Sequence, residues 1–368
     1  MTRRKLTAAY NKFGFNLLRQ LAEECDDTNI LFSPISLGLA LAMLYDGASG
    51  RTQQAIGEVL CREGMDDQEF NESNSLLLST FNNPGLRLQL MMPIAIWMDR
   101  DFSFSPAYLQ LTKNVFKADV SSVDFKDPRT VNLINGWSRE KTNGKIEALI
   151  NDDDLSSVTG GILTNAVYFK GFWVEPFDKG MTRTGVFYLG NGKQKYVLLM
   201  TQSISCPYLE TDAFEAVCLQ YSDRFSMYIF VPDKNSSLKV FLRNLNEVNL
   251  EHWLTQFEDS PVELSLPRFQ IKAEYDLKNT LGHLGMEIVF THKADFTPMG
   301  LTHHFISKVI HKAVIEVNEE GTEAAAATAV MLVRSIPKTF VINRPFFLMI
   351  RDIKNDMTLF TGVVAYPD

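Results

Sequence analysis

The chain has few cysteines, no long apolar run and no excess of basic residues. Its 368 residues include four cysteines, Cys25, Cys61, Cys206 and Cys218. Their irregular spacing contains no Cys-x-x-Cys pair, so it indicates neither a zinc site nor a dense disulfide framework. Cys218 lies between apolar neighbours, which is typical of a buried thiol. We therefore expect isolated thiols.

Apolar runs and net charge together argue against membrane and nucleic-acid partners. The richest apolar stretch, Leu37 to Leu44, continues into Tyr45 and Asp46, well short of the roughly 20 residues that span a bilayer. A formal net charge of −8 and a pI near 5.4 argue against binding that depends on releasing counterions from phosphates. The sequence predicts a folded protein that binds neither membranes nor nucleic acids.

The N-terminal stretch begins with a basic cluster but lacks a continuous apolar segment and a cleavage site. Phe13, Leu17 and Leu21 recur at helical spacing, so this stretch is predicted to be the first folded helix. We expect either synthesis without a signal peptide or a mature form behind a new methionine. An extracellular location is favoured, with the cytoplasm as the alternative.

Recognisable catalytic and metal-binding motifs are missing as well. There is no Gly-x-Ser-x-Gly sequence, and no serine is tied to a histidine and an acid in a known nucleophile motif. His292, His303, His304 and Asp295 lie close in sequence, but their spacing matches no common ligand pattern, so a solvated loop is expected there. The sequence predicts no cofactor, no metal and no enzymatic activity.

What is present is a globular composition with a helical first part and a strand-rich second part. Hydrophobic residues make up 45% of the chain and charged residues 22%, close to the average of folded domains. Ser33-Pro34 is typical of a helix start, and another helix is predicted from Val131 to Thr142. After about residue 160 strand patterns dominate, as in Val262 to Leu266. Residues 1–368 are therefore predicted to form one α+β domain.

The segment from His311 to Arg334 has conflicting local preferences. Val314, Ile315 and Val317 favour a strand, whereas Ala324 to Ala327 favour a helix. In a strand, alternate side chains fall on opposite faces. One face would then hold only small or aliphatic residues: Thr322, Ala324, Ala326, Thr328, Val330 and Leu332. This is typical of a loop that can become a strand, and the alternative is an exposed alanine-rich helix or linker.

A series of motifs in fixed order resembles the serpin family over essentially the full length. The resemblance is carried by Asn29-Ile-Leu-Phe-Ser-Pro-Ile-Ser36, Gly47-Ala-Ser-Gly-Arg-Thr52, Leu163-Thr-Asn-Ala-Val-Tyr-Phe-Lys-Gly-Phe-Trp173, Leu266-Pro-Arg-Phe269, Ala294-Asp-Phe296, Arg344-Pro-Phe-Phe347 and Leu359-Phe-Thr-Gly362. Most specific is the run from Asn318 to Thr328, which is similar to the hinge of inhibitory serpins at nearly every position.

The resemblance implies both a fold and a mechanism. The implied fold is a single domain with three β-sheets, about eight or nine α-helices and an exposed reactive-centre loop near residues 319–338. The implied function is irreversible, suicide-substrate inhibition of a serine protease, in which the cut loop inserts as a strand into the main sheet after an acyl-enzyme forms. The implied partner is the target protease in a covalent one-to-one complex, and the inhibitor is expected to be a monomer.

Three groups of site residues follow from the resemblance. The hinge consists of Glu319, Glu320, Gly321, Thr322, Glu323, Ala324, Ala325, Ala326, Ala327 and Thr328. The family's polar cluster beneath the opening sheet is matched by Ser33, Ser36, Asn165 and His311, so His311 is interpreted as a hydrogen-bonded gate rather than a base. Trp173, Arg268 and Glu319 match the region where the loop enters. We hypothesise an Arg268–Glu319 ion pair that rearranges on insertion, and the alternative is an ordinary surface pair.

The reactive bond is placed at Arg334-Ser335. Counting forward from Gly321 by the usual inhibitory spacing puts Ser335 before the scissile bond, whereas counting back from Pro345 puts Arg334 there. Arg334 is preferred because an exposed arginine is what a trypsin-like specificity pocket with a buried carboxylate binds. This choice makes the hinge segment one residue shorter than the common pattern.

Alternatives remain for both the bond and the function. Ser335-Ile336, Val333-Arg334 for an elastase-like enzyme, and Lys338 stay open, and Arg334 as a solubilising loop charge is the simplest alternative role. The alternative function is a non-inhibitory serpin that acts as a ligand carrier or chaperone. Some serpins bind heparin through a basic helix, but the corresponding residues 62–80 carry five acidic side chains against Arg62 alone, so heparin activation through this helix is not expected.

Overall fold

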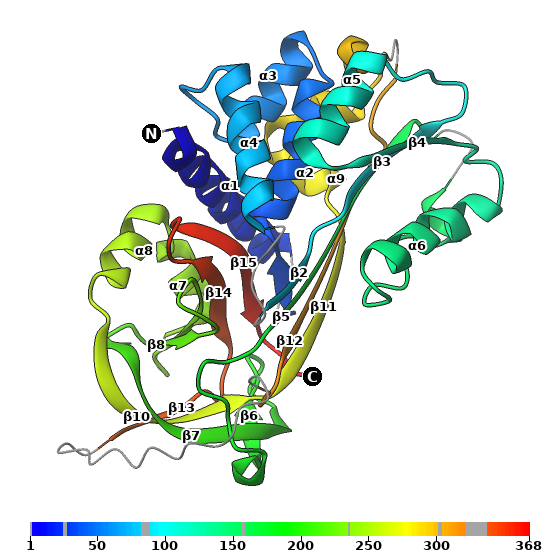
Figure 1. The fold of residues 1–368 in the computed structure, drawn as a ribbon. Helices are drawn as coiled ribbons and strands as arrows, with labels where there is room; N and C mark the ends of the chain where they lie inside the picture. The colour runs from blue at the N-terminus through cyan, green and yellow to red at the C-terminus, as the bar shows by residue number, and fades with distance from the viewer. Residues whose placement is uncertain are drawn as a thin grey trace.

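The computed structural model describes residues 2–24, 28–81, 88–155, 159–234, 236–300, 304–320 and 337–368 (Figure 1). Nine α-helices lie in these ranges: α1 (Thr2–Glu24), α2 (Pro34–Asp46), α3 (Gly50–Val59), α4 (Asp67–Phe81), α5 (Pro106–Leu111), α6 (Arg129–Lys141), α7 (Leu238–Asn244), α8 (Glu247–Leu254) and α9 (Lys278–Leu281). The predicted helix from Val131 is confirmed as part of α6.

A six-stranded sheet runs through the middle of the molecule, in the order β11-β12-β5-β3-β4 with β2 paired to β5. Its strands are β2 (Leu88–Met91), β3 (Ile94–Asp99), β4 (Asp119–Val123), β5 (Gly161–Gly171), β11 (Phe269–Asp276) and β12 (Lys308–Val317). The two central strands β5 and β12 are parallel and pair directly, from Ile162 opposite Lys308 to Lys170 opposite Glu316.

A nine-stranded sheet has the order β1-β15-β14-β9-β8-β7-β10-β13, with β6 paired to β7. Its strands are β1 (Ile30–Phe32), β6 (Arg183–Tyr188), β7 (Gln194–Glu210), β8 (Phe214–Gln220), β9 (Phe225–Pro232), β10 (Glu258–Pro267), β13 (Lys338–Val341), β14 (Phe346–Asp352) and β15 (Met357–Val364). Because the 17-residue β7 pairs with β6 and β10 and also reaches β8, two of the three expected sheets are continuous through this strand.

Helix α2 supports the middle of the six-stranded sheet. Ser33 caps it, accepting a hydrogen bond from the Ser36 backbone N–H at 3.2 Å, and Pro34 occupies the first turn, as the sequence predicts. The helix is buried along almost its whole length. It lies within the group of helices α1 to α5 and α9 at one end of the molecule, whereas α6 stands apart beside the sheet (Figure 1).

The six-stranded sheet is covered on both faces, which explains the nearly continuous apolar character of β5 and β12. Leu163, Val167 and Ile315 belong to the main core, which also contains the helices. Tyr168 and Val314, on the alternate positions, belong to a second, smaller core that α6 shares through Ile134. The face toward the main core is called the inner face below, and the other the outer face.

Three further expectations concern cysteines and membrane spans. Cys61, Cys206 and Cys218 carry free thiols, and Cys206 and Cys218 are buried. Cys25 lies outside the described residues. No helix in the described part of the chain is long and apolar enough to cross a membrane.

Candidate functional site

The four residues of the predicted gate lie together on the inner face, between α2 and the β5–β12 pair. His311 of β12 and Asn165 of β5 are register partners, and their Nδ1 and Oδ1 atoms are 2.7 Å apart. The Asn165 amide donates to Ser36 Oγ at 2.7 Å, and the Ser33 backbone N–H donates to His311 Nε2 at 3.4 Å. These four residues, the gate cluster, therefore connect both strands to one helix.

The gate cluster is neutral and has no contact with solvent. All four residues have an exposed fraction of 0%. Since the Asn165 nitrogen donates to Ser36, its oxygen faces His311, so His311 Nδ1 carries the proton and Nε2 accepts. Burial lowers the pKa of His311 to about 3, because the imidazolium would lose its hydration there. Such a histidine holds strands in place and is not suited to accept protons near neutral pH.

Trp173 lies just beyond β5, beside the residues that follow β12. Its indole Nε1–H donates to the Asn318 backbone oxygen at 2.8 Å, and its ring stacks on Tyr221 at 4.3 Å between centroids. The ring is buried, so its position is set by packing. Trp173 thus fixes the chain two residues before Glu320.

The hypothesised Arg268–Glu319 contact is present as a long ion pair. Arg268 Nη1 lies 3.8 Å from Glu319 Oε2, and the Thr182 hydroxyl donates to Glu319 Oε1 at 2.8 Å. The Glu319 carboxylate is buried, whereas the Arg268 side chain is about half exposed. Glu319 is therefore held more closely by the hydroxyl than by the guanidinium.

Three charged residues that sequence reasoning missed, Lys170, Lys179 and Glu316, lie close to Glu320 of the predicted hinge. Lys170 Nζ lies 3.2 Å from Glu320 Oε2 and 3.6 Å from Glu316 Oε1, and Lys179 Nζ lies 3.3 Å from Glu320 Oε1. Hydrogen bonds from Lys170 and Lys179 lower the pKa of Glu320. We call Lys170, Lys179, Glu316 and Glu320 the entry cluster. The available signal was one charged residue near the end of each largely apolar strand, Lys170 in β5 and Glu316 in β12.

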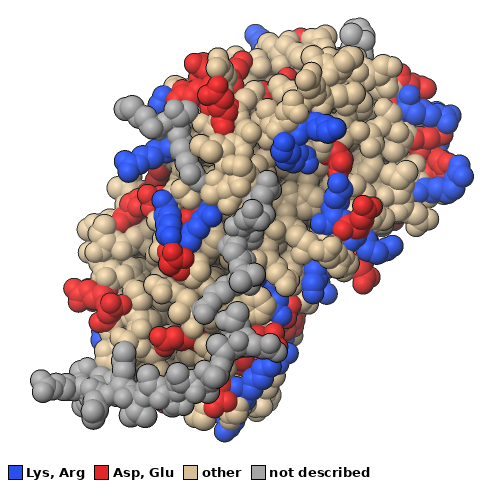
Figure 2. Space-filling view, viewed as in Figure 1, with Lys and Arg blue, Asp and Glu red and all other residues tan. Residues whose placement is uncertain are grey.

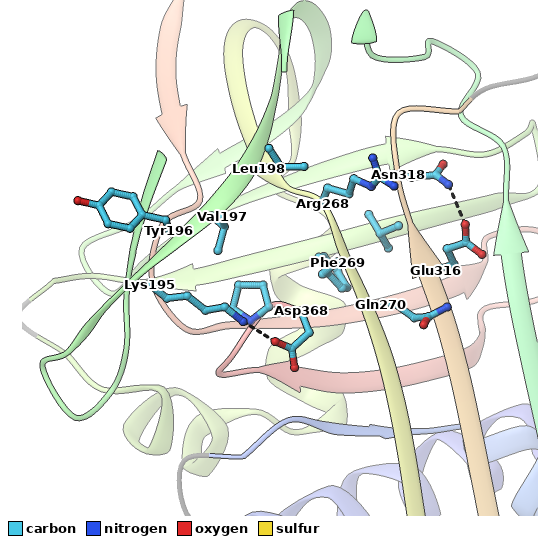
Figure 3. Close-up of a pocket in the computed structure, with 12 residues that line it drawn as sticks. Lys195, Tyr196, Val197, Leu198, Arg268, Phe269, Gln270, Glu316, Asn318 and Asp368 are labelled. Carbon is cyan, nitrogen blue, oxygen red and sulfur yellow. Dashed lines mark hydrogen bonds and ion pairs between the residues drawn. The ribbon is translucent and has the colours of Figure 1, made fainter. Parts of the chain in front are cut away.

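A pocket of about 560 Å³ adjoins this region, between the start of β7, the junction of β10 with β11, and the C-terminus. Figure 3 shows Arg268 and Asn318 close together at one end of the pocket and Lys195 beside Asp368 at the other. Asn318 donates to Glu316 Oε1 at 2.9 Å, and Glu316 belongs both to the pocket wall and to the entry cluster.

The predicted hinge is described only at Glu319 and Glu320. The hinge from Gly321 to Thr328 and the bond Arg334-Ser335 lie outside the described residues, as does His303. Two other members of the histidine group considered as a metal site have ordinary contacts. Asp295 accepts hydrogen bonds from Ser49 and Thr297, and the His292 ring packs against Phe305. Over the described ranges, no group of three or more potential metal ligands comes together.

Comparison with known proteins identifies the family. The family model of serpins, described as serine protease inhibitors, matches residues 8–367. The chain belongs to the serpin family. It is 34% identical to the leukocyte elastase inhibitor of Bos taurus over 99% of this chain and all of that one, and 32% identical to Serpin B6 of Pongo abelii over 98% and 99%.

The solved structures confirm the expected fold. Human thyroxine-binding globulin, solved in complex with thyroxine, covers the full chain with a TM-score of 0.91 and 29% identity. The α+β serpin fold is therefore established for this protein, and the nine α-helices of the described residues agree with the expected eight or nine. Serine protease inhibition is the general activity that the family and the inhibitory relatives support, with a target protease as the partner.

The prediction about enzymatic activity needs a correction. It rested on the absence of recognisable catalytic motifs, and an absence of motifs decides nothing about activity. What the findings establish is positive: the family is described as serine protease inhibitors. The role of this protein therefore follows from its membership in that family.

Proposed function

We propose that this serpin is an irreversible, suicide-substrate inhibitor of trypsin-like serine proteases, with residues 1–368 as one domain and Arg334-Ser335 as the reactive bond. One observation carries the proposal: β5 and β12 pair directly, and Glu320 is attached at their shared end. A chain that continues from residue 320 can become a strand between these two neighbours. Addition of a strand to a sheet is an established way for serpin loops to be bound.

The chemistry is supplied by the protease. Its serine Oγ attacks the Arg334 carbonyl carbon, the peptide bond to Ser335 breaks, and the new amino group leaves with a proton. The carbonyl of Arg334 is then joined to the protease as an ester. Insertion of the preceding segment carries the ester away before water hydrolyses it.

The sequence of the segment supports insertion. The 13 residues from Thr322 to Arg334 reach roughly 43 Å as a strand, at about 3.3 Å each. This exceeds the length of the 11-residue β5. The alternate residues from Thr322 to Ala326 are small, so they offer no steric obstacle on a buried face.

A carrier or chaperone role is the second candidate. It is favoured by the likeness to thyroxine-binding globulin, which was solved with thyroxine bound. The small-residue hinge argues for inhibition instead, because a carrier has no need of a segment that fits between two strands.

The first test mixes the protein with a panel of trypsin-like proteases and looks for an SDS-resistant one-to-one complex. Arg334→Ala should remove complex formation with trypsin-like enzymes while leaving the fold intact by circular dichroism. Cleavage of the wild-type protein without a trapped complex would overturn the inhibitor proposal and favour the carrier. If Arg334→Ala still traps the protease, the reactive bond is not Arg334-Ser335 but one of the neighbouring bonds considered above.

A second test uses two adjacent alanines as a matched pair. Ala324→Arg places a long cation on the face predicted to be buried by insertion, whereas Ala325→Arg places it on the opposite face. The first variant should be cut as a substrate without trapping, and the second should still trap. Equal behaviour of the two variants would contradict strand insertion.

A further inference from the structure

An ion pair joins the last two register partners of β5 and β12. Lys170 and Glu316 are register partners, and Lys170 Nζ lies 3.6 Å from Glu316 Oε1. This register pair is the one nearest to the start of the reactive loop, because β12 ends at Val317. Both side chains are partly buried, with exposed fractions of 17% and 28%. Solvent therefore screens this pair less than a fully exposed one.

The same lysine also holds the start of the loop. Glu320 comes after β12, yet its carboxylate is bound by Lys170 of β5 and by Lys179, which opens the short 3₁₀ turn Lys179–Met181. The Glu320 backbone N–H is in turn fixed by the side-chain oxygen of Asn318 at 3.0 Å. Lys170 is thus shared between one carboxylate on β12 and one on the loop.

Strand insertion must break this arrangement. A new strand between β5 and β12 moves them apart by one strand spacing, about 4.8 Å. A Lys–Glu contact of 3.6 Å across the pair does not survive that displacement without rearrangement. Since the loop enters at this end, the contacts of Lys170 and Lys179 lie where opening begins.

We infer that Lys170 is a positioning residue that slows opening of the β5–β12 pair until the loop is cut, by binding Glu316 and Glu320 together. This inference rests on the proposed function, because it concerns the rate of the insertion step. Removing the lysine charge lowers the barrier to opening. The barrier is also lowered by salt, which screens partly exposed ion pairs.

The test measures insertion without a protease. A synthetic acetylated peptide with the sequence of residues 322–333 is incubated with the full-length protein, and incorporation is followed by native electrophoresis and by the rise in thermal unfolding temperature. Lys170→Met keeps most of the side-chain volume and removes the charge. We expect incorporation to be roughly threefold to tenfold faster in this variant than in wild type at low salt.

The dependence of the incorporation rate on salt distinguishes an electrostatic role of Lys170 from a purely structural one. Between 0.01 M and 1 M ionic strength, the screening length falls from about 30 Å to about 3 Å. Wild-type incorporation should accelerate over this range and approach that of Lys170→Met, which should change little. An equal salt response of the two proteins would overturn the inference.

Lys312→Met is the matched control. Lys312 and Glu274 are register partners on β12 and β11, with Nζ and Oε2 2.6 Å apart and a lysine side chain that is 20% exposed. This pair resembles Lys170–Glu316 but crosses a pair of strands that insertion leaves closed. Lys312→Met should therefore incorporate the peptide at the wild-type rate, and an acceleration like that of Lys170→Met would overturn the inference.

A charge exchange protects the test against a simple folding defect. Lys170→Glu places three carboxylates together and should incorporate fastest, and adding Glu316→Lys should restore a rate close to wild type. Failure of the double variant to slow incorporation would count against the inference. Trapping of proteases by the wild-type protein is measured in parallel. If no complex forms but Lys170→Met still accelerates peptide incorporation, the result contradicts the proposed function and not the inference about Lys170.

Discussion

Two register pairs hold β5 and β12 together by different interactions, one by a buried hydrogen bond and the other by a partly exposed ion pair. His311 and Asn165 face inward, are neutral and have an exposed fraction of 0%. Lys170 and Glu316, five rungs further along, face outward, carry full charges and are partly exposed. The first pair is fixed by α2 and the second by residues that lead into the loop.

This difference predicts which conditions each pair responds to. A buried hydrogen bond depends on desolvation and geometry, so losing one partner leaves the other unsatisfied at a cost that salt does not change. A partly exposed ion pair contributes little to stability and is weakened by salt. The His311–Asn165 contact in the middle of the two strands therefore stabilises the fold, whereas the Lys170–Glu316 contact at their end affects the rate at which the strands separate.

The largest expected effect is that of His311→Ala. It leaves Asn165 Oδ1 and the Ser33 backbone N–H without this partner in a dry site. We expect a loss of about 2 to 5 kcal/mol in the free energy of unfolding, measured by urea denaturation. The loss should be the same at low and high salt, and a strong salt dependence would erase the contrast with the entry cluster.

Acid should weaken the same site. The pKa of His311 is lowered by burial to about 3, below its ordinary value of 6.5, so the unfolded chain binds the proton more strongly. The contribution is fully present above about pH 6.5 and is lost as the pH falls toward 3. By pH 4 the loss in the free energy of unfolding is on the order of 3 kcal/mol. Stability of His311→Gln should fall less steeply over this range, and parallel curves would contradict the assignment.

Asp46, at the end of α2, should respond to pH with the opposite sign. Burial raises its pKa to about 7, and its Oδ2 atom has no hydrogen-bond partner among the described residues. Its stabilising contribution is present below about pH 4 and is lost as the pH rises through 7. Asp46→Asn should therefore stabilise the protein at pH 8 by on the order of 1 to 3 kcal/mol and hardly at pH 4. A gain that is equal at both values would be due to packing.

The smallest expected effect is that of Glu316→Gln. It removes one partly exposed ion pair, so the free energy of unfolding should fall by less than about 1 kcal/mol, and the difference should vanish at high salt. Glu274→Gln, on the neighbouring strand pair, should behave alike in the same urea titration. A loss as large as that of His311→Ala would show that the outer pair is as important for stability as the inner one.

Much of the fold could be predicted because its signals are local. Ser33-Pro34 specifies the start of α2 through capping alone, and the apolar alternation of Val262 to Leu266 specifies part of β10. The gate residues were proposed from ordered family motifs, and the structure brings all four together. Their role in loop insertion stays a prediction.

Glu320 was predicted as a hinge residue, but its contacts in the entry cluster were not, because these contacts depend on register. Lys170 and Glu316 are far apart in sequence, and only the pairing of β5 with β12 sets them opposite each other. A shift of one residue would have placed Lys170 beside an inward-facing apolar side chain. Pairing between distant strands is decided by the whole core, so no short pattern contains it.

The parallel direction of β5 and β12 has a consequence for the sheet itself. A chain that leaves the end of β12 and turns back between the two strands must run against both of them. One parallel ladder would thus be exchanged for two antiparallel ladders, which are slightly more stable per residue. Under the proposed mechanism, the uncut protein keeps an incomplete sheet whose missing strand is part of its own chain, and a single peptide cleavage frees that strand to complete it.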